Sequence, residues 1–181
     1  MPKRLALVLS LASAGSVLLA AAPADAAQGV TFTLTAGALT VSDPADKSLG
    51  SVATGTATVT NTLGNTTVVD SRGALLGTWT STVSSTDFTT GTATEDETIT
   101  KDLVDYYSGA ATAFSGTAVL VPGQATALLA QDLGAARTAF SATGVVGNNS
   151  ATWVPTVVVN IPSDSVAGTY SGTITHSVTG A

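Results

Sequence analysis

Side chains able to carry out acid–base or nucleophilic chemistry are few in this chain. There is one histidine, His176, and no cysteine. A Ser-His-Asp triad would have to use His176, yet the sequence has no Gly-x-Ser-x-Gly elbow to present a serine nucleophile. His176 also has apolar neighbours two positions away on either side, Ile174 and Val178, which is typical of a packed or edge-strand histidine. These counts exclude a metal site built on several His or Cys ligands.

Carboxylates offer the other route to an active site, because a glycosidase needs only two of them on opposite sides of a sugar bond. A run such as Glu95-Asp96-Glu97 is more typical of a solvated surface loop. Calcium binding by these oxygens is a further alternative, although their spacing does not follow the twelve-residue loop with a central glycine and a closing glutamate. We therefore predict no enzyme, no metal site and no cofactor. The carboxylates considered are Asp87, Glu95, Asp96, Glu97, Asp102 and Asp105.

Aromatic side chains are the remaining candidates for ligand contact. They could form a flat platform for stacking sugar rings, but a chain with only 5% aromatic residues is expected to place Trp79 and Trp153 in its core. Tyr106 and Tyr107 are adjacent, and neighbouring strand residues point to opposite faces, so one of them should be partly exposed. The candidate ligand-binding residues are Tyr106, Tyr107, Trp153, Trp79 and His176.

The first 27 residues are typical of a secretory signal peptide. Lys3-Arg4 precede an apolar stretch, and Ala24-Asp25-Ala26 provides the small residues of a cleavage site. No later segment approaches the roughly 20 apolar residues that a membrane span needs, and we see neither a hydrophobic tail nor a sorting motif at the C-terminus. We therefore predict an extracellular protein that is released or held at the cell surface non-covalently.

Charge and length narrow the classes of partner. Residues 28–181 are enough for one domain with a real core, and without cysteine that domain must be stabilised by packing and strand pairing. The net charge of −6 argues against nucleic acid, which is bound by clustered Lys and Arg. It also disfavours anionic lipids and wall teichoic acids, and leaves neutral glycans open. The basic residues after position 27 are Lys47, Arg72, Lys101 and Arg137.

Threonine alternates with small and β-branched apolar residues over most of the chain. Such residues fit a pleated, half-buried surface, and turn signals separate the alternating runs. The pattern predicts an all-β, Greek-key or immunoglobulin-like β-sandwich of antiparallel strands. We expect strands at residues 30–35, paired with 38–42, and at 55–60, 67–70, 78–84, 116–121 and 137–143. Residues 71–73 should form a bend and 144–149 a loop, and residues 125–136 are either a short helix or irregular edge strands.

The last thirty residues predict a closing hairpin. An apolar run up to Ile161 is followed by turn-forming residues at 162–168 and then by an alternating strand from Tyr170 to Val178.

Residues 150–162 and 167–175, together with an earlier tryptophan segment at 76–84, resemble parts of the WxL-type cell-surface domain of Gram-positive bacteria. In that family a long strand ending in Val-Pro leads through a Gly-x-Tyr turn into a final Thr-rich strand. The signature tripeptide Trp-x-Leu is not preserved here. Trp79 is followed by Thr-Ser and Trp153 by Val-Pro, and His176-Ser177-Val178 stands where the last tripeptide would fall.

The resemblance implies a single WxL-like domain over residues 28–181 that associates non-covalently with peptidoglycan or with other exported surface proteins. We therefore predict a secreted, non-catalytic cell-surface protein. A second hypothesis is a structural or assembly subunit whose exposed strand edges pair with partners. A third is a small carboxylate-dependent glycan hydrolase.

Overall fold

The computed structural model describes residues 28–181, and the predicted leader at 1–27 lies outside them. The chain divides into two units, Met1–Leu34 and Thr35–Ala181. In the first unit, residues 28–34 are extended without strand pairing, and Val30, Phe32 and Leu34 are 83%, 91% and 87% exposed. The strand predicted at 30–35 is therefore wrong, because an alternating pattern forms a strand only beside a neighbour that supplies its hydrogen bonds.

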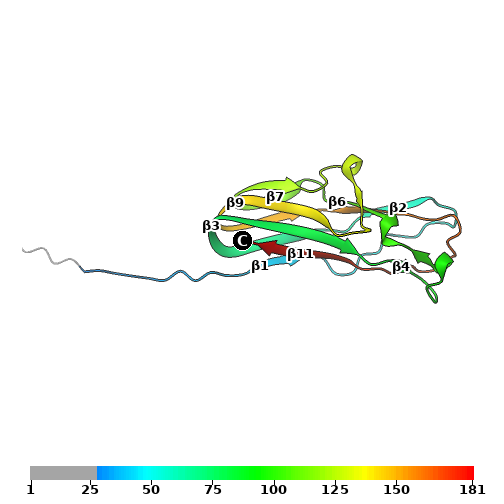
Figure 1. The fold of residues 1–181 in the computed structure, drawn as a ribbon, viewed down its shortest axis with the longest axis horizontal. Helices are drawn as coiled ribbons and strands as arrows, with labels where there is room; N and C mark the ends of the chain where they lie inside the picture. The colour runs from blue at the N-terminus through cyan, green and yellow to red at the C-terminus, as the bar shows by residue number, and fades with distance from the viewer. Residues whose placement is uncertain (1–27) are drawn as a thin grey trace, which may run out of the picture. The chain divides into compact units, whose positions relative to one another are not determined.

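The second unit is an all-β sandwich whose strand pairs are all antiparallel, as predicted (Figure 1). One sheet has the order β1 (Leu39–Ser42), β3 (Thr66–Ser85), β9 (Arg137–Trp153) and β7 (Ala111–Pro122), with β11 (Ile174–Gly180) also on β3. The second sheet has the order β2 (Thr58–Thr62), β10 (Thr156–Asn160), β6 (Val104–Tyr107) and β8 (Gln131–Asp132). A short ladder joins β4 (Phe88–Thr89) to β5 (Thr98–Ile99).

Two long strands, β3 and β9, form the centre of the larger sheet, where the sequence predicted a bend and a loop. Residues 71–73 and 144–149 both belong to strands, and Leu75 lies opposite Val146. The register shifts between Asp70 and Ala74, and Gly73 and Gly147 have φ values of 65° and 66°. Glycine adopts such values without steric cost, so the turn-like residues are absorbed as irregularities within continuous strands.

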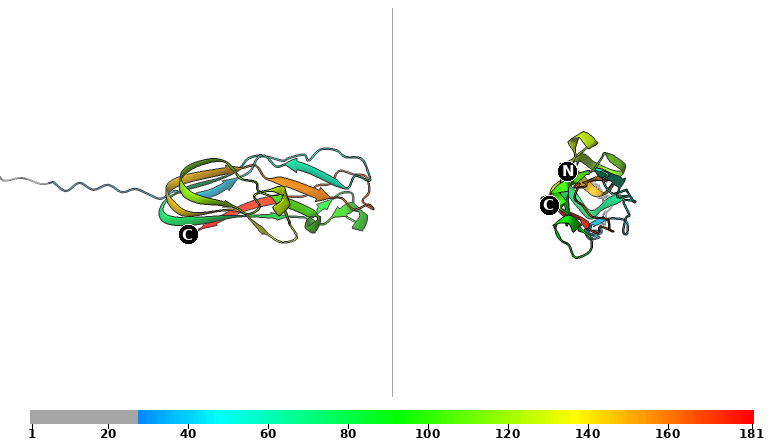
Figure 2. Two further views of the ribbon diagram at one scale, coloured as in Figure 1. Left: turned by 90° about the horizontal axis from the view of Figure 1, so that it is seen from above. Right: turned by 90° about the vertical axis from the view of Figure 1, so that its right-hand side faces the viewer.

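The predicted closing hairpin is wrong, because its two strands belong to different sheets. β10 pairs with β2 and β6, whereas β11 pairs with β3. In Figure 2, β10 (orange) lies beside β2 (teal) and apart from β11 (red). The connection at residues 161–173 is long enough to cross between the sheets, and on the way Ser171 bridges to Thr89.

One further expectation is wrong, because β1 pairs with β3 and not with residues 30–35. Of the two alternatives for residues 125–136, the irregular edge strand is confirmed and the α-helix is not. These residues form a 3₁₀ turn (Ala127–Leu129) followed by the short β8 at the edge of the smaller sheet. Only Leu133 of the leucines in this stretch is buried, whereas Leu128 is 97% exposed, so the expected apolar helix face does not exist. The other 3₁₀ turns are Glu95–Glu97 and Lys101–Leu103.

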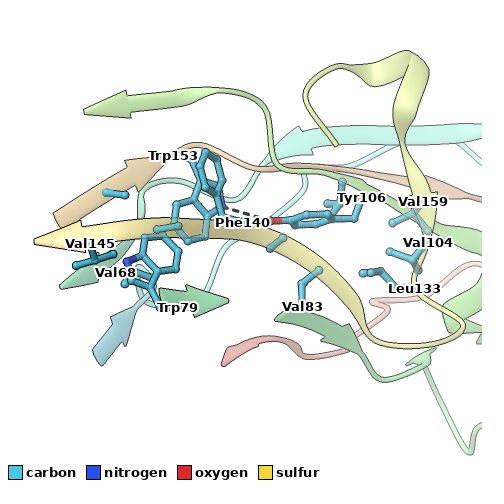
Figure 3. Packing of buried hydrophobic residues seen from close by; sticks show 14 of the residues in the cluster. Val68, Trp79, Val83, Val104, Tyr106, Leu133, Phe140, Val145, Trp153 and Val159 are labelled. Carbon is cyan, nitrogen blue, oxygen red and sulfur yellow. Dashed lines mark hydrogen bonds between the residues drawn. The ribbon is translucent and has the colours of Figure 1, made fainter. Parts of the chain in front are cut away.

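The core lies between the inner faces of the two sheets (Figure 3). Trp79 and Trp153 are both buried there, as predicted, and Trp153 stacks on Phe140 with ring centroids 4.9 Å apart. The larger sheet contributes Val68, Trp79, Val83, Phe140 and Val145, and the smaller sheet contributes Val104, Tyr106, Val157 and Val159.

Candidate functional site

Three of the five predicted ligand-binding residues meet in one buried hydrogen-bond chain that crosses the sandwich. Trp153 Nε1 donates to the Tyr106 hydroxyl oxygen at 3.4 Å (Figure 3). The same hydroxyl lies 3.0 Å from Nε2 of His176 on β11. Since the Tyr106 oxygen already accepts a hydrogen bond from Trp153, its own O–H is available to donate to His176. These two hydrogen bonds therefore connect the end of β9 to strand β6, and β6 to β11.

The other ring nitrogen of His176 reaches toward the surface. Nδ1 lies 3.0 Å from Oδ2 of Asp43, in the loop after β1, and Thr66 Oγ1 donates to the second carboxylate oxygen at 2.6 Å. Burial alone would raise the pKa of Asp43, but the hydrogen bonds from His176 and Thr66 outweigh it and hold that pKa below its usual value. We call Trp153, Tyr106, His176, Asp43 and Thr66 the buried chain.

The buried chain has the order carboxylate, imidazole, hydroxyl that a Ser-His-Asp triad uses, with the Tyr106 phenol in the place of the serine. Tyr106 is fully buried, so a substrate has no access to its oxygen. Burial also raises the pKa of Tyr106, which is the opposite of what activates a nucleophile. The geometry therefore supports a structural role for His176, and its prediction as a packed histidine is confirmed.

A second set of polar contacts includes the buried Trp79 and an ion pair on the same strand. Trp79 Nε1 donates to Oδ1 of Asn149 at 3.2 Å. Nearby on β3, the guanidinium of Arg72 donates to both oxygens of Asp70, each at 2.9 Å, and these bonds hold the Asp70 pKa below its usual value. Sequence reasoning missed Asp70, although it shares the inward parity of Val68 within β3. The pair fixes the irregular middle of β3 and does not form an open site.

Tyr107, the last of the five candidates, lies on the face of β6 opposite Tyr106. It is half-buried, so the expected split between the two tyrosines is confirmed. Three of the six carboxylates considered for catalysis accept hydrogen bonds from separate partners. Asp87 accepts from the Lys101 backbone N–H at 2.8 Å, and Asp105 accepts from the Asn160 side chain at 2.9 Å. Glu97 accepts from backbone and hydroxyl groups of two threonines of its own loop, which lowers its pKa to about 2.

The open concave surface lies elsewhere, between two loops. A groove of about 890 Å³ is lined by residues 46–55 on one side and 165–172 on the other, over a floor of Phe88, Ile99, Val159 and Ile161. We call it the loop groove. A cavity of about 180 Å³ shares Leu49 and Phe88 with it and extends to Asp43 and His176. The surface end of the buried chain therefore opens beside the loop groove.

Hydrogen bonds hold the 165–172 wall of the loop groove in place. The single O–H of Tyr170 is shared between two backbone oxygens, that of Val166 at 3.0 Å and that of Asp96 at 3.1 Å. Ser171 and Thr89 exchange backbone hydrogen bonds of 2.9 and 3.0 Å. Sequence reasoning did not find this groove, because one wall includes residues 165–168, which were predicted only as a turn, and the other is residues 46–55, for which no site was predicted. The available signal was two half-buried aromatic residues that line the groove, Phe88 on β4 and Tyr170 in the second loop.

Comparisons with protein-family models, with curated proteins and with solved structures each find no match to this chain. The class that the structure defines is thus an antiparallel β-sandwich with a groove between two of its loops. Among residues 28–181, no helix is long and apolar enough to cross a membrane. Within the same residues, no group of three or more His, Cys, Asp or Glu side chains is placed to hold a metal ion.

Proposed function

We propose that this chain is a secreted, non-catalytic cell-surface protein that associates non-covalently with peptidoglycan of the cell wall or with other exported surface proteins. The observation that carries the proposal is the loop groove. Its volume of about 890 Å³ falls within the range of roughly 300–1,000 Å³ typical of ligand sites, and residues of both loops line it.

The lining of the loop groove suits a polysaccharide with little net negative charge. Phe88 and Tyr170 offer aromatic surface against which the apolar face of a sugar ring can stack. Hydroxyls at the rim supply donors and acceptors for sugar hydroxyl and amide groups. The net charge of −6 works against anionic polymers, whereas the glycan strands of peptidoglycan carry N-acetyl groups that fit an apolar floor. The rim hydroxyls come from Ser48, Ser51, Thr54, Ser165, Thr169 and Ser171.

Co-sedimentation of residues 28–181 with purified peptidoglycan sacculi tests the proposal, with and without calcium. The informative variant is Val166→Asp, because Val166 lines the loop groove and is exposed, so a charge there blocks an apolar contact without disturbing the core. The control is Leu75→Asp, an exposed apolar residue on β3 that does not line the groove; Leu75 is 81% exposed and Val166 is 43% exposed. We expect saturable binding that Val166→Asp abolishes and Leu75→Asp leaves intact. Binding by neither the original chain nor the control would contradict the wall as a partner.

A second candidate function, an assembly subunit that pairs through strand edges, is favoured by strand β7. It has one hydrogen-bonded neighbour, β9, and lies at the end of the larger sheet. It carries no charged residue, and Val119 and Val121 are 64% and 50% exposed. Edges of this kind accept an added strand through backbone hydrogen bonds. Sedimentation velocity of residues 28–181 tests this role, which predicts oligomers at micromolar concentration and is contradicted by a monomer.

A further inference from the structure

β7 is the most available acceptor of a strand in the second unit. It has twelve residues, and the next longest described strand with one hydrogen-bonded neighbour is β11, with seven. Protein sheets usually shield such edges with short strands, charges or bulges. β7 uses bulges around Gly116, where its register against β9 shifts, but from Val119 to Pro122 the register is regular. Pro122 has no backbone N–H, so an added strand would end there.

Residues 30–35 have the properties of the missing partner strand. They alternate Val30, Phe32 and Leu34 with threonines, which is a strand pattern, and they carry no charge. Their exposure of 83–91% at the apolar positions leaves a complete apolar face without cover in the first unit. At about 3.3 Å per residue, six residues extend over about 20 Å, longer than the regular part of β7.

We infer that residues 30–35 of one copy add as a strand to the edge of β7 in a second copy. The inference rests on the assembly role proposed above and names its partner. Neither surface has a charged side chain, so two copies of an acidic chain meet where their charges do not repel. Each copy carries one donor segment and one acceptor edge, so the contact is heterologous and joins copies head to tail into chains.

The test uses residues 28–181, the whole of the chain that the structure describes, in sedimentation velocity over a concentration series. Phe32→Asp breaks the donor, and Val119→Lys breaks the acceptor. Both positions are exposed, so neither change disturbs the fold, and thermal unfolding checks this. We expect oligomers from the original chain and monomers from each variant alone. A synthetic peptide of residues 28–36 should occupy the β7 edges and dissociate the oligomers, whereas the same peptide with Phe32→Asp should not.

Mixing the two variants separates this arrangement from its alternatives. The Val119→Lys chain keeps its donor and the Phe32→Asp chain keeps its edge, so an equimolar mixture should form a one-to-one dimer and stop there. Oligomers that persist in Phe32→Asp but are lost in Val119→Lys would overturn the donor role of residues 30–35 and leave edge pairing in place. A monomeric original chain would overturn both the donor strand and the assembly role.

Discussion

The buried chain and the loop groove are neighbouring regions with opposite properties. The buried chain holds the residues most often used in chemistry, a histidine, a tyrosine and a carboxylate, but Tyr106 and most of His176 are closed to solvent. The loop groove is lined mainly by small and apolar residues of the kind found in any loop, yet it is open and large. The comparison shows that residue type and accessibility are separated in this molecule: the side chains suited to chemistry are closed to solvent, whereas the accessible concave surface is formed by loop residues.

The largest expected effect comes from Trp153→Ala. Trp153 is fully buried, stacks on Phe140 and donates to Tyr106, so its loss leaves a large cavity. We expect the free energy of unfolding to fall by about 3–5 kcal/mol, measured by urea denaturation. The control is Leu128→Ala, at a leucine that is 97% exposed, which should change stability by less than about 0.5 kcal/mol. Similar losses in the two variants would contradict the described core.

A smaller loss is expected for Tyr106→Phe, which keeps the ring and removes the hydroxyl. His176 Nε2 and Trp153 Nε1 then lose a shared partner inside the protein, at a cost of about 1–3 kcal/mol. Tyr107→Phe is the matched control, because Tyr107 is half-buried on the opposite face of the same strand. Equal stability of Tyr106→Phe and the original chain would show that the buried chain contributes nothing to the fold.

The next largest effect is expected on acidification, which protonates Asp43 of the buried chain and Asp70 on β3. The folded-state pKa of Asp43 and that of Asp70 are both lowered from 3.8, so the ionised forms stabilise the fold. That stability is fully present above the usual pKa of 3.8 and is lost as the pH falls through the lower folded values. Unfolding midpoints measured from pH 5 downward should show a steep decline below about pH 4, reduced in Asp43→Asn. A decline of equal slope in that variant would remove Asp43 from the account.

The smallest effect is expected for Glu97→Gln, in an exposed loop. Its carboxylate accepts hydrogen bonds from Thr92 and Thr94, and its pKa is lowered to about 2. The amide lacks the charge and one acceptor oxygen, so we expect faster amide hydrogen exchange at the two threonines with the global unfolding midpoint unchanged. Unchanged exchange at both threonines would show that the loop is ordered by other contacts.

The sequence predicted what depends on local pattern and missed what depends on pairing. Alternation of threonine with valine indicated the all-β sandwich, and the scarcity of aromatic residues indicated that Trp79 and Trp153 are core residues. The same alternation failed at residues 30–35, because it does not show whether a neighbouring strand exists. The closing hairpin failed for the same reason, since strand order is a property of distant contacts.

The candidate site was the least predictable part. His176 was recognised as a packed residue, but its partners Asp43 and Tyr106 are 133 and 70 positions away, and nothing in their local sequence links them. The loop groove is formed by loops that come together only when the sheets pack. Whether the chain functions as the WxL resemblance implies stays a prediction.

The most direct test of the central claim measures sacculus binding and stability together in Val166→Asp, Tyr106→Phe and the original chain. Binding at the loop groove predicts that Val166→Asp loses co-sedimentation with an unchanged unfolding midpoint. It also predicts that Tyr106→Phe binds as the original chain does but unfolds more easily. The reverse pattern, with binding lost in folded Tyr106→Phe and kept in Val166→Asp, would contradict the account and return the site to the buried chain.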